Sequence, residues 1–317
     1  MAATTDEAIL SALTNPFHET YLGKVFCMDS LELLSSLPDD SVDLFVTSPP
    51  YDGQSKYQDG QAYGRRWYSD VFLPITEQIL RVLSPTGNFV LNYRSRRYNK
   101  ERGTLQYELV FWLREQGWLF VEDFVWGKLN PPPGRFVQCV KDSVEYCFQF
   151  AKTRDFAFYP QQCLSKSKLG DHERKYRNAL NSKNRPSRER RPSGHGASEA
   201  NARPDLVLPS NLISENIANY SNCSWFKGAR AMGLHPASFP EEIPDFFIRL
   251  MTRPGEVVCD PFAGSGTVGA SATKLGRRFL ICDVQPLYCE IARLRLNEMP
   301  QISLFDGSGE SIVGTPE

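Results

Sequence analysis

A glycine-rich segment near the C-terminal end of the chain has the composition of a loop that binds a ligand. It reads Asp260-Pro-Phe-Ala-Gly-Ser-Gly-Thr-Val-Gly269, and its glycines match the pattern G-x-G-x-x-G. Glycine lets the backbone come close to an anionic or carboxylate ligand at the start of a helix. Taken alone, the pattern is only a weak indication of a dinucleotide site.

An acidic residue follows this segment where a nucleotide site would need one. Asp283 ends an apolar segment 23 residues after Asp260. A carboxylate at that place can accept hydrogen bonds from ribose hydroxyls. The alternative is a glycine turn followed by an acid that caps a helix, but it does not account for strand, loop, helix, strand and acid in this order. The sequence therefore predicts a cofactor that contains an adenosine moiety.

A second segment, Thr47-Ser48-Pro49-Pro50-Tyr51, ends an apolar strand and suits chemistry on an amino group. The two prolines fix φ and remove two N–H groups, so the carbonyl groups there lack strand partners. Ser48 Oγ and the Pro49 carbonyl can accept hydrogen bonds from an amine, and Tyr51 offers a flat face to a planar ring. An exocyclic base amine is a poor nucleophile, and such acceptors stabilise the charge that grows as it attacks. A rigid strand exit with a surface tyrosine is the alternative.

The elements that would position these segments alternate between strand and helix. Ligands of such α/β sheets bind at the carboxyl ends of parallel strands. The sequence predicts seven strands at 24–28, 42–48, 88–93, 118–126, 144–150, 256–260 and 277–283, helices at 30–37, 71–83, 105–116, 240–251, 268–275 and 287–297, and a turn at 85–87.

Residues 163–230 differ in character, because Ser, Asn, Arg, Lys, Pro and Gly dominate there and periodicity is lost. Residues 166–203 hold eleven basic and four acidic side chains, in a chain whose formal net charge is -1. We expect an insert or linker rather than a core segment. Clustered Lys and Arg neutralise phosphates, which favours a polyanion partner, although a solvated linker has the same composition.

Together the segments TSPPY, DPFAGSGTVG and HPASFPEEIPDFFIRLMTRPGE resemble amino-group DNA methyltransferases that use S-adenosylmethionine. The order of the segments is similar to the β group of that family, over about residues 24–297. The resemblance implies a circularly permuted, Rossmann-like class I methyltransferase fold, with a mixed, mostly parallel seven-stranded sheet. It also implies four parts: a catalytic half (1–162), a basic target-recognition insert (163–230), a cofactor-binding half (231–300) and a tail (301–317).

The resemblance assigns roles to particular residues of this chain. Catalytic roles fall on Ser48, Pro49, Pro50 and Tyr51, with Tyr51 stacking on a flipped-out base. Lys128 is placed near them. Cofactor contacts fall on Asp29, His235, Phe239, Asp260, Phe262, Ala263, Gly264, Ser265, Gly266, Thr267 and Asp283. DNA contacts fall on Lys166, Lys168, Arg174, Lys175, Arg185, Arg188, Arg190 and Arg191 of the insert. Apart from the resemblance, Arg94, Arg96 and Arg97 after the strand 88–93 are candidates for phosphate contacts, and a solvated loop is the alternative.

The base and the substrate class leave alternatives. Family members with Ser before Pro-Pro are mostly cytosine-N4 enzymes, so Ser48 favours cytosine in duplex DNA over adenine N6. An enzyme acting on RNA or on protein glutamine, a silent DNA-binding subunit and an NAD enzyme are further alternatives. The basic insert disfavours a protein substrate, the intact motifs disfavour a silent subunit, and an NAD enzyme leaves residues 48–51 unexplained.

Composition limits the remaining classes. The chain of 317 residues is 41% apolar and 23% charged, which excludes a disordered protein, and no apolar run is long enough to span a membrane. The eight cysteines contain no C-x-x-C pair, so we expect reduced thiols and no metal. The N-terminus does not resemble a secretory signal, which predicts a cytoplasmic, nucleoid-associated protein. The resemblance also leaves a homodimer open.

Overall fold

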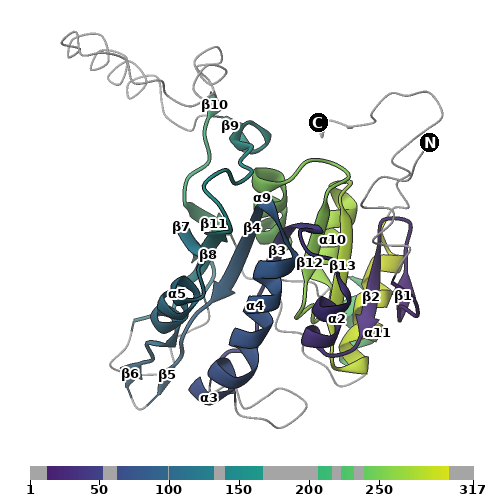
Figure 1. Cartoon of the computed structure of the whole chain (residues 1–317), viewed down its shortest axis with the longest axis horizontal. Helices are drawn as coiled ribbons and strands as arrows, with labels where there is room; N and C mark the ends of the chain where they lie inside the picture. Colours follow the sequence, from purple (N-terminus) through teal and green to yellow (C-terminus); the bar gives the residue numbers. More distant parts are fainter. Residues whose placement is uncertain are drawn as a thin grey trace.

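A computed structural model describes residues 13–52, 63–98, 100–131, 140–166, 206–215, 223–231 and 239–299. Its centre is a nine-stranded sheet with the order β1-β2-β13-β12-β3-β4-β8-β7-β11 (Figure 1). The strands are β1 (His18–Glu19), β2 (Gly23–Cys27), β3 (Val42–Thr47), β4 (Leu83–Tyr93), β7 (Leu119–Lys128), β8 (Val144–Ala151), β11 (Leu212–Glu215), β12 (Val257–Asp260) and β13 (Arg278–Asp283).

The pairing is mixed and mostly parallel, as predicted. Strands β2, β13, β12, β3 and β4 are parallel neighbours, β8 is antiparallel to both β4 and β7, and β11 is parallel to β7. The expectation of seven strands is wrong, because two short edge strands extend the sheet. β1 has only two residues, and β11 lies in the polar stretch where sequence periodicity is lost.

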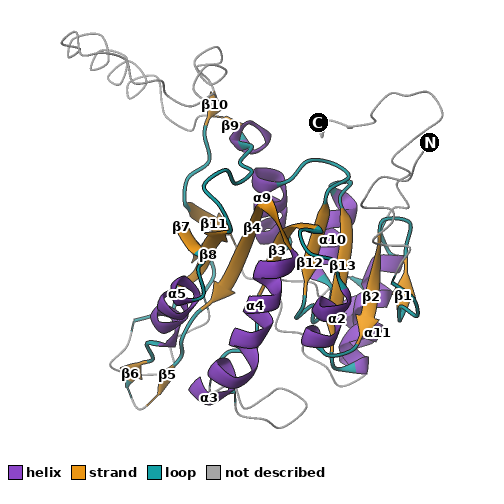
Figure 2. Cartoon of the chain, viewed as in Figure 1, coloured by secondary structure: helices purple, strands orange, loops and turns teal. Residues whose placement is uncertain are grey.

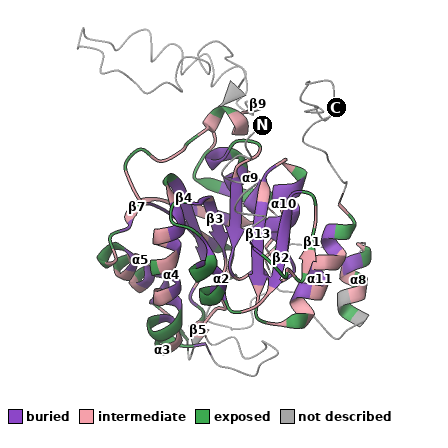
Figure 3. Cartoon of the chain, turned by 45° about the vertical axis from the view of Figure 1, so that its right-hand side comes forward, coloured by how far each residue is buried: buried purple, intermediate pink, exposed green. Residues whose placement is uncertain are grey.

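Helices cover both faces of the sheet (Figure 2). One face packs against α2 (Ser30–Ser36), α4 (Leu73–Val82) and α5 (Leu105–Glu115), and the other against α9 (Glu242–Met251), α10 (Thr267–Lys274) and α11 (Pro286–Asn297). Within β13, Leu280 and Cys282 belong to the first core cluster, whereas Phe279 and Ile281 belong to the second. Strands buried on both faces read as continuous apolar runs, which is why the sequence reveals them (Figure 3).

The expected turn at 85–87 lies inside β4. The register of β4 against β3 jumps from Leu83 opposite Val42 to Asn88 opposite Leu44. The backbone passes so close to its neighbours here that an added Cβ on Gly87 would lie 2.9 Å from the carbonyl oxygen of Asp43. A glycine therefore allows an irregular, bulged strand where the sequence indicated a turn.

Two parts of the stretch 163–230 belong to the folded body, contrary to the expectation of an insert without core segments. Ile213 of β11 is buried in the second core cluster. Helix α8 (Ser224–Ala231) packs against α11, with Trp225 buried at their contact. Few apolar residues surround these anchors in the sequence, so hydrophobic periodicity does not mark them.

The described borders of the basic segment lie at the amino ends of the parallel strands. The turn η2 (Pro160–Cys163) rests on the end of α9, where Tyr159 N donates to the Leu250 carbonyl at 2.6 Å. The two short strands β9 (Ser165–Lys166) and β10 (Leu206–Val207), which pair antiparallel, follow it (Figure 1). At the opposite end of the sheet lie α3 (Arg65–Trp67), the π-helical turn η1 (Tyr68–Phe72) and the hairpin β5 (Arg97–Tyr98) and β6 (Glu101–Arg102).

No helix among the described residues has the length and apolar composition needed to span a membrane.

Candidate active site

The two sequence segments meet where the sheet reverses its order. β3 continues through α4 to β4 on one side, and β12 continues through α10 to β13 on the other. β3 and β12 are parallel neighbours, with Leu44 opposite Val258 and Phe45 opposite Cys259. Chains that leave two adjacent strands in opposite directions open a crevice at their carboxyl ends. The residues after Thr47 and after Asp260 border that crevice.

A hydrogen bond joins the two segments directly. Thr47 Oγ1 donates to Asp260 Oδ1 at 2.6 Å, and the backbone N–H of Phe262 donates to the same oxygen at 3.0 Å. The Asp260 side chain is only 2% exposed. Burial raises the pKa of Asp260 to about 7, while the two hydrogen bonds act in the opposite direction. Asp260 therefore holds the glycine-rich loop against the end of β3.

The loop after β12 is held on three sides. Ser30 Oγ at the start of α2 donates to the Pro261 carbonyl at 2.6 Å, and Ala263 N donates to the Cys282 carbonyl at 2.9 Å. Phe262 packs against the aromatic rings of Trp67 and Phe72, with centroid distances of 6.1 and 6.0 Å. The loop is therefore fixed by α2, by β13 and by the helical segment that follows the Pro-Pro-Tyr motif.

Glycine is required at two positions of the loop for different structural reasons. Gly264 and Gly266 both have positive φ values, of 49° and 74°. An added Cβ on Gly266 would lie 2.8 Å from Cβ of Ala292 on α11, whereas one on Gly264 would meet nothing within 4 Å. Gly266 thus permits close helix packing, and Gly264 borders open space in front of α10. That space is where the sequence predicts a ligand.

Two of the three predicted cofactor acids, Asp283 and Asp29, are held by backbone amides. Asp283 accepts hydrogen bonds from Gly264 N and Gln285 N, each at 2.9 Å, and burial raises its pKa to about 6. Asp29 caps α2 by accepting from Leu31 N at 2.8 Å. Both carboxylates sit at strand ends beside the crevice. Their contacts with ribose and adenine stay predictions.

Sequence reasoning missed Arg295, which supports the loop from behind. This residue of α11 is 1% exposed, and its guanidinium donates to Thr267 Oγ1 at 2.8 Å and to Ser265 Oγ at 3.4 Å. It also pairs with Glu241 at 2.6 Å and stacks over the Trp225 ring at 4.5 Å. An arginine in an amphipathic helix normally faces solvent, so no signal in the sequence marked it.

The Pro-Pro-Tyr segment is fixed by hydroxyl groups of neighbouring tyrosines. Tyr68 Oη donates to the Pro50 carbonyl. Tyr93 Oη donates to Asp52 Oδ1 at 2.9 Å, and the Tyr93 ring meets the Tyr51 ring edge-on at 5.0 Å. These contacts hold the chain on both sides of Tyr51.

The Tyr51 hydroxyl enters a buried polar network that the sequence did not reveal. Tyr51 Oη lies 2.9 Å from Asn92 Oδ1 at the end of β4 and 3.0 Å from Glu145 Oε2 at the start of β8. Ser48 Oγ donates to Tyr51 Oη at 3.4 Å. Burial, and then the negative charge of Glu145, raise the pKa of Tyr51 well above its ordinary value. The hydroxyl therefore stays protonated at neutral pH.

Lys128, which the resemblance placed near the catalytic motif, reaches this network through Glu145. Its ammonium pairs with Glu145 Oε1, and both side chains are about one-tenth exposed. The same ammonium lies 4.8 Å above the Trp126 ring. Because this charge pair is buried, its groups need hydrogen-bonding partners in fixed positions, and this restricts the orientation of the Tyr51 hydroxyl.

The structure brings some predicted residues together and separates others. Ser48, Pro49, Pro50 and Tyr51 lie beside the loop from Asp260 to Thr267. Phe239 is half-buried against the second core cluster. Lys166 lies in β9, at the opposite end of the sheet from Ser48. Several residues with predicted roles lie outside the described residues: His235, Lys168, Arg174, Lys175, Arg185, Arg188, Arg190 and Arg191.

One of the arginines that follow β4, Arg94, shares an acid with Arg102 of β6. Arg94 and Arg102 pair with Asp142 Oδ1, at 3.1 and 2.8 Å. These contacts brace the β5–β6 hairpin beside the Pro-Pro-Tyr segment. Any contact of the hairpin with phosphate stays a prediction.

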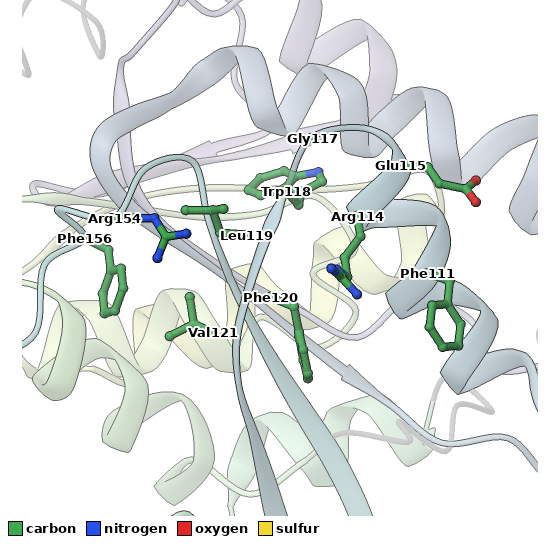
Figure 4. Close-up of a pocket in the computed structure, with 10 residues that line it drawn as sticks. All are labelled: Phe111, Arg114, Glu115, Gly117, Trp118, Leu119, Phe120, Val121, Arg154 and Phe156. Carbon is green, nitrogen blue, oxygen red and sulfur yellow. The ribbon is translucent and has the colours of Figure 1, made fainter.

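A surface pocket of about 790 Å³ lies away from the catalytic motif (Figure 4). It is lined by the end of α5, the start of β7 and the segment after β8, including Phe111, Arg114, Phe120 and Arg154. None of the predicted site residues lines it. The convergence of polar groups, rather than pocket size, identifies the crevice between β3 and β12 as the candidate active site.

The chain is similar in sequence and in fold to known DNA methyltransferases. Residues 42–294 match the N6/N4 DNA methylase family. The type II methyltransferase M.PvuII of Proteus hauseri is 31% identical over 88% of this chain and 85% of its own length. M.Cfr9I of Citrobacter freundii is 26% identical, over 84% of this chain and 85% of its own. The solved PvuII DNA methyltransferase (cytosine-N4-specific) superposes with a TM-score of 0.68 at 26% identity, covering 90% of this chain and 91% of that one.

Proposed function

Because this chain belongs to the N6/N4 DNA methylase family, we propose that it is a site-specific DNA methyltransferase acting on the N4 amine of cytosine. The methyl donor of the proposal is S-adenosylmethionine. The observation that carries the proposal is the 2.6 Å hydrogen bond between Thr47 and Asp260, which puts the acceptor-rich motif beside the glycine-rich loop. A methyl donor held by one segment would meet an amine held by the other.

Two observations favour cytosine over adenine. Ser48 occupies the position before Pro-Pro, and the solved relative with a TM-score of 0.68 is described as cytosine-N4-specific. The relatives M.PvuII and M.Cfr9I are type II methyltransferases, which supports a role in a restriction-modification system.

The residues around the loop suit S-adenosylmethionine. The open space in front of Gly264, the uncapped start of α10 and the carboxylate of Asp283 offer room, backbone N–H groups and acceptors. Asp29 and Phe262 border the same crevice from β2 and β12. When bound, the cofactor supplies an electrophilic methyl group on a sulfonium sulfur, so the chain needs neither a metal nor a covalent nucleophile for the transfer.

The Pro-Pro-Tyr motif prepares the amine. Ser48 Oγ and the Pro49 carbonyl accept hydrogen bonds from its two N–H groups, which favours a pyramidal nitrogen with a more available lone pair. As the nitrogen gained the methyl group, the bond from that carbon to sulfur would break and a neutral thioether would leave. The nitrogen would become positive and would then release one proton to water. Acceptors fixed in place before the reaction stabilise that developing charge without reorganising. The well-held Tyr51 ring provides one wall for the planar base.

In this proposal the amine at the catalytic motif belongs to a base of duplex DNA. A base amine inside a stacked duplex is out of reach, so in this proposal the target cytosine leaves the helix stack and enters the crevice. Basic side chains of the segment 166–203 would bind phosphates, independently of sequence. The described borders of that segment lie at the far end of the sheet from Ser48, and the residues between them lie outside the described ranges.

The test is to incubate the protein with duplex DNA and isotopically labelled S-adenosylmethionine, digest the DNA to nucleosides and identify the product by mass. We expect N4-methylcytosine. N6-methyladenine would keep the fold and the mechanism but overturn the assignment of the base. Label in RNA or protein, with none in DNA, would overturn the substrate class.

A further inference from the structure

The buried carboxylate of Glu145 contacts the hydroxyl of Tyr51, a residue of the proposed catalytic motif. We propose that Glu145 is a positioning residue for the transfer reaction. Acting through the hydroxyl of Tyr51, it turns the hydroxyl hydrogen of Ser48 away from the target amine, so that Ser48 presents lone pairs to that amine. This inference rests on the proposed function and adds a residue to its machinery.

Glu145 is placed for this role by the sheet. It lies at the start of β8, next to Tyr146, which is opposite Tyr93 at the end of β4. Its side chain is about one-tenth exposed, and its two oxygens point to different partners. Oε1 accepts from the Lys128 ammonium, and Oε2 lies 3.0 Å from Tyr51 Oη. A carboxylate paired with an ammonium can only accept hydrogen bonds.

The direction of the Tyr51 proton follows from its neighbours. Asn92 Nδ2 donates to the Tyr146 carbonyl at 3.1 Å, which fixes Oδ1 as the amide atom that faces Tyr51. Asn92 Oδ1 and Glu145 Oε2 are both acceptors, so the single phenolic proton points to them. A charged acceptor attracts that proton more strongly than a neutral one. In the 3.4 Å contact with Ser48, the Tyr51 oxygen is then the acceptor.

The orientation of Ser48 is the consequence that matters for the reaction. With its hydrogen directed at Tyr51, Ser48 Oγ keeps its lone pairs for other donors. An exocyclic amine offers N–H donors, and it would be repelled by a hydroxyl hydrogen aimed at it. Hydrogen bonds in such a chain polarise one another, so the Glu145 charge also makes Ser48 a better acceptor.

The first test compares Glu145→Gln with the unaltered protein in single-turnover methylation of duplex DNA. Glutamine keeps the shape but removes the charge, and its amide can donate to Tyr51 and reverse the chain. We expect the methylation rate to fall on the order of 10–100-fold, as for other groups that orient an active-site residue. We expect the dissociation constants for S-adenosylmethionine and DNA to stay within about twofold, because the change is confined to orientation. An unchanged methylation rate would overturn the proposal.

The second test asks whether Glu145 acts through Tyr51. In a Tyr51→Phe background the relay is already broken, so adding Glu145→Gln should slow methylation no further. An equal fold loss in both backgrounds would overturn the proposal in favour of an independent role. Asp123→Asn, which removes an exposed carboxylate from the neighbouring strand β7, is the matched control and should leave the rate unchanged.

A third variant separates positioning from a merely structural role as the counterion of Lys128. Lys128→Met combined with Glu145→Gln removes both buried charges. If Glu145 only neutralised Lys128, the double variant would recover the rate that Glu145→Gln lost, which would overturn the proposal. We expect it to stay slow while its unfolding temperature recovers. If the unaltered protein methylates no DNA, the proposed function fails first; if it does, only the variants decide on Glu145.

Discussion

The hydroxyl of Thr47 donates a 2.6 Å hydrogen bond to the carboxylate of Asp260, across 213 positions of the sequence. The contact joins the ends of β3 and β12, which are neighbours in the sheet because the N- and C-terminal halves of the chain interleave there. One half contributes the acceptors for an amine, and the other contributes the glycine-rich loop. The bond therefore links the two segments directly.

Replacing Ser48 by alanine tests the role of its oxygen in the transfer. Ser48→Ala removes one acceptor for the target amine and leaves the glycine-rich loop intact. We expect the methylation rate to fall on the order of 100-fold, the cost of losing one group that stabilises developing charge. We expect the dissociation constant for S-adenosylmethionine, measured by calorimetry, to change little. Parallel loss of rate and cofactor affinity would refute the role given to Ser48.

Asp260 should make the protein less stable as the pH rises. Its pKa is about 7 in the folded protein, above the ordinary value of 3.8. Between those values the unfolded chain has lost a proton that the folded protein keeps, so the free energy of unfolding falls with rising pH and levels off above about pH 7. Between pH 5 and 7 the loss amounts to about 2–3 kcal/mol.

The matched variant for this prediction is Asp260→Asn. Both hydrogen bonds reach Oδ1, so an asparagine oxygen retains them without the charge. Urea unfolding of both proteins at pH 5 and pH 7 makes the measurement. The unaltered protein should lose stability over this interval by more than the variant does. Identical pH dependence of the two proteins would show that Asp260 does not titrate in this range.

The two loop glycines should respond differently to alanine. Gly266→Ala adds a Cβ 2.8 Å from Ala292 in a left-handed backbone conformation, so it should lower the free energy of unfolding by roughly 2–4 kcal/mol. Gly264→Ala meets open space and should cost about 1 kcal/mol for the backbone conformation alone. Its larger effect should be on S-adenosylmethionine affinity, because the added methyl group enters the predicted cofactor space. Unchanged affinity in Gly264→Ala would place the cofactor elsewhere.

The sequence predicted the parts of the fold that bury two faces. The seven inner strands appear in the sequence as apolar runs. The motifs at the ends of β3 and β12 are recognisable by their proline and glycine residues. The edge strands β1 and β11 escaped because a short, half-exposed strand needs few apolar residues. The turn predicted at 85–87 was wrong because close packing, which no local pattern records, turned a Pro-Thr-Gly sequence into a bulged strand.

The supporting polar residues of the site could not be predicted from the sequence, for a different reason. Glu145, Asn92 and Arg295 are each defined by partners far away in the sequence, and their local context is that of ordinary surface or strand residues. Burial of a charge becomes evident only when its partner is placed beside it. Lys128 was singled out through the resemblance alone, and its pairing with Glu145 came from the structure.

Arg295 should control cofactor binding from behind the loop. Arg295→Met keeps much of the side-chain volume but removes the hydrogen bonds to Thr267 and Ser265 and the ion pair with Glu241. We expect S-adenosylmethionine affinity to fall about tenfold as the loop loosens. The free energy of unfolding should fall by roughly 1–3 kcal/mol, the cost of hydrogen bonds that involve charged groups.

The control for this prediction lies on the same helix. Arg293 is about one-third exposed and pairs only locally, with Glu290 three residues away, among the contacts described for it. Exposed pairs of this kind contribute little, so Arg293→Met should change stability by less than about 0.5 kcal/mol and leave cofactor affinity unchanged. For both variants, calorimetric titration measures the affinity for S-adenosylmethionine, and urea unfolding measures the free energy of unfolding. If Arg295→Met loses stability but binds the cofactor as tightly as Arg293→Met does, the arginine stabilises the fold without shaping the loop.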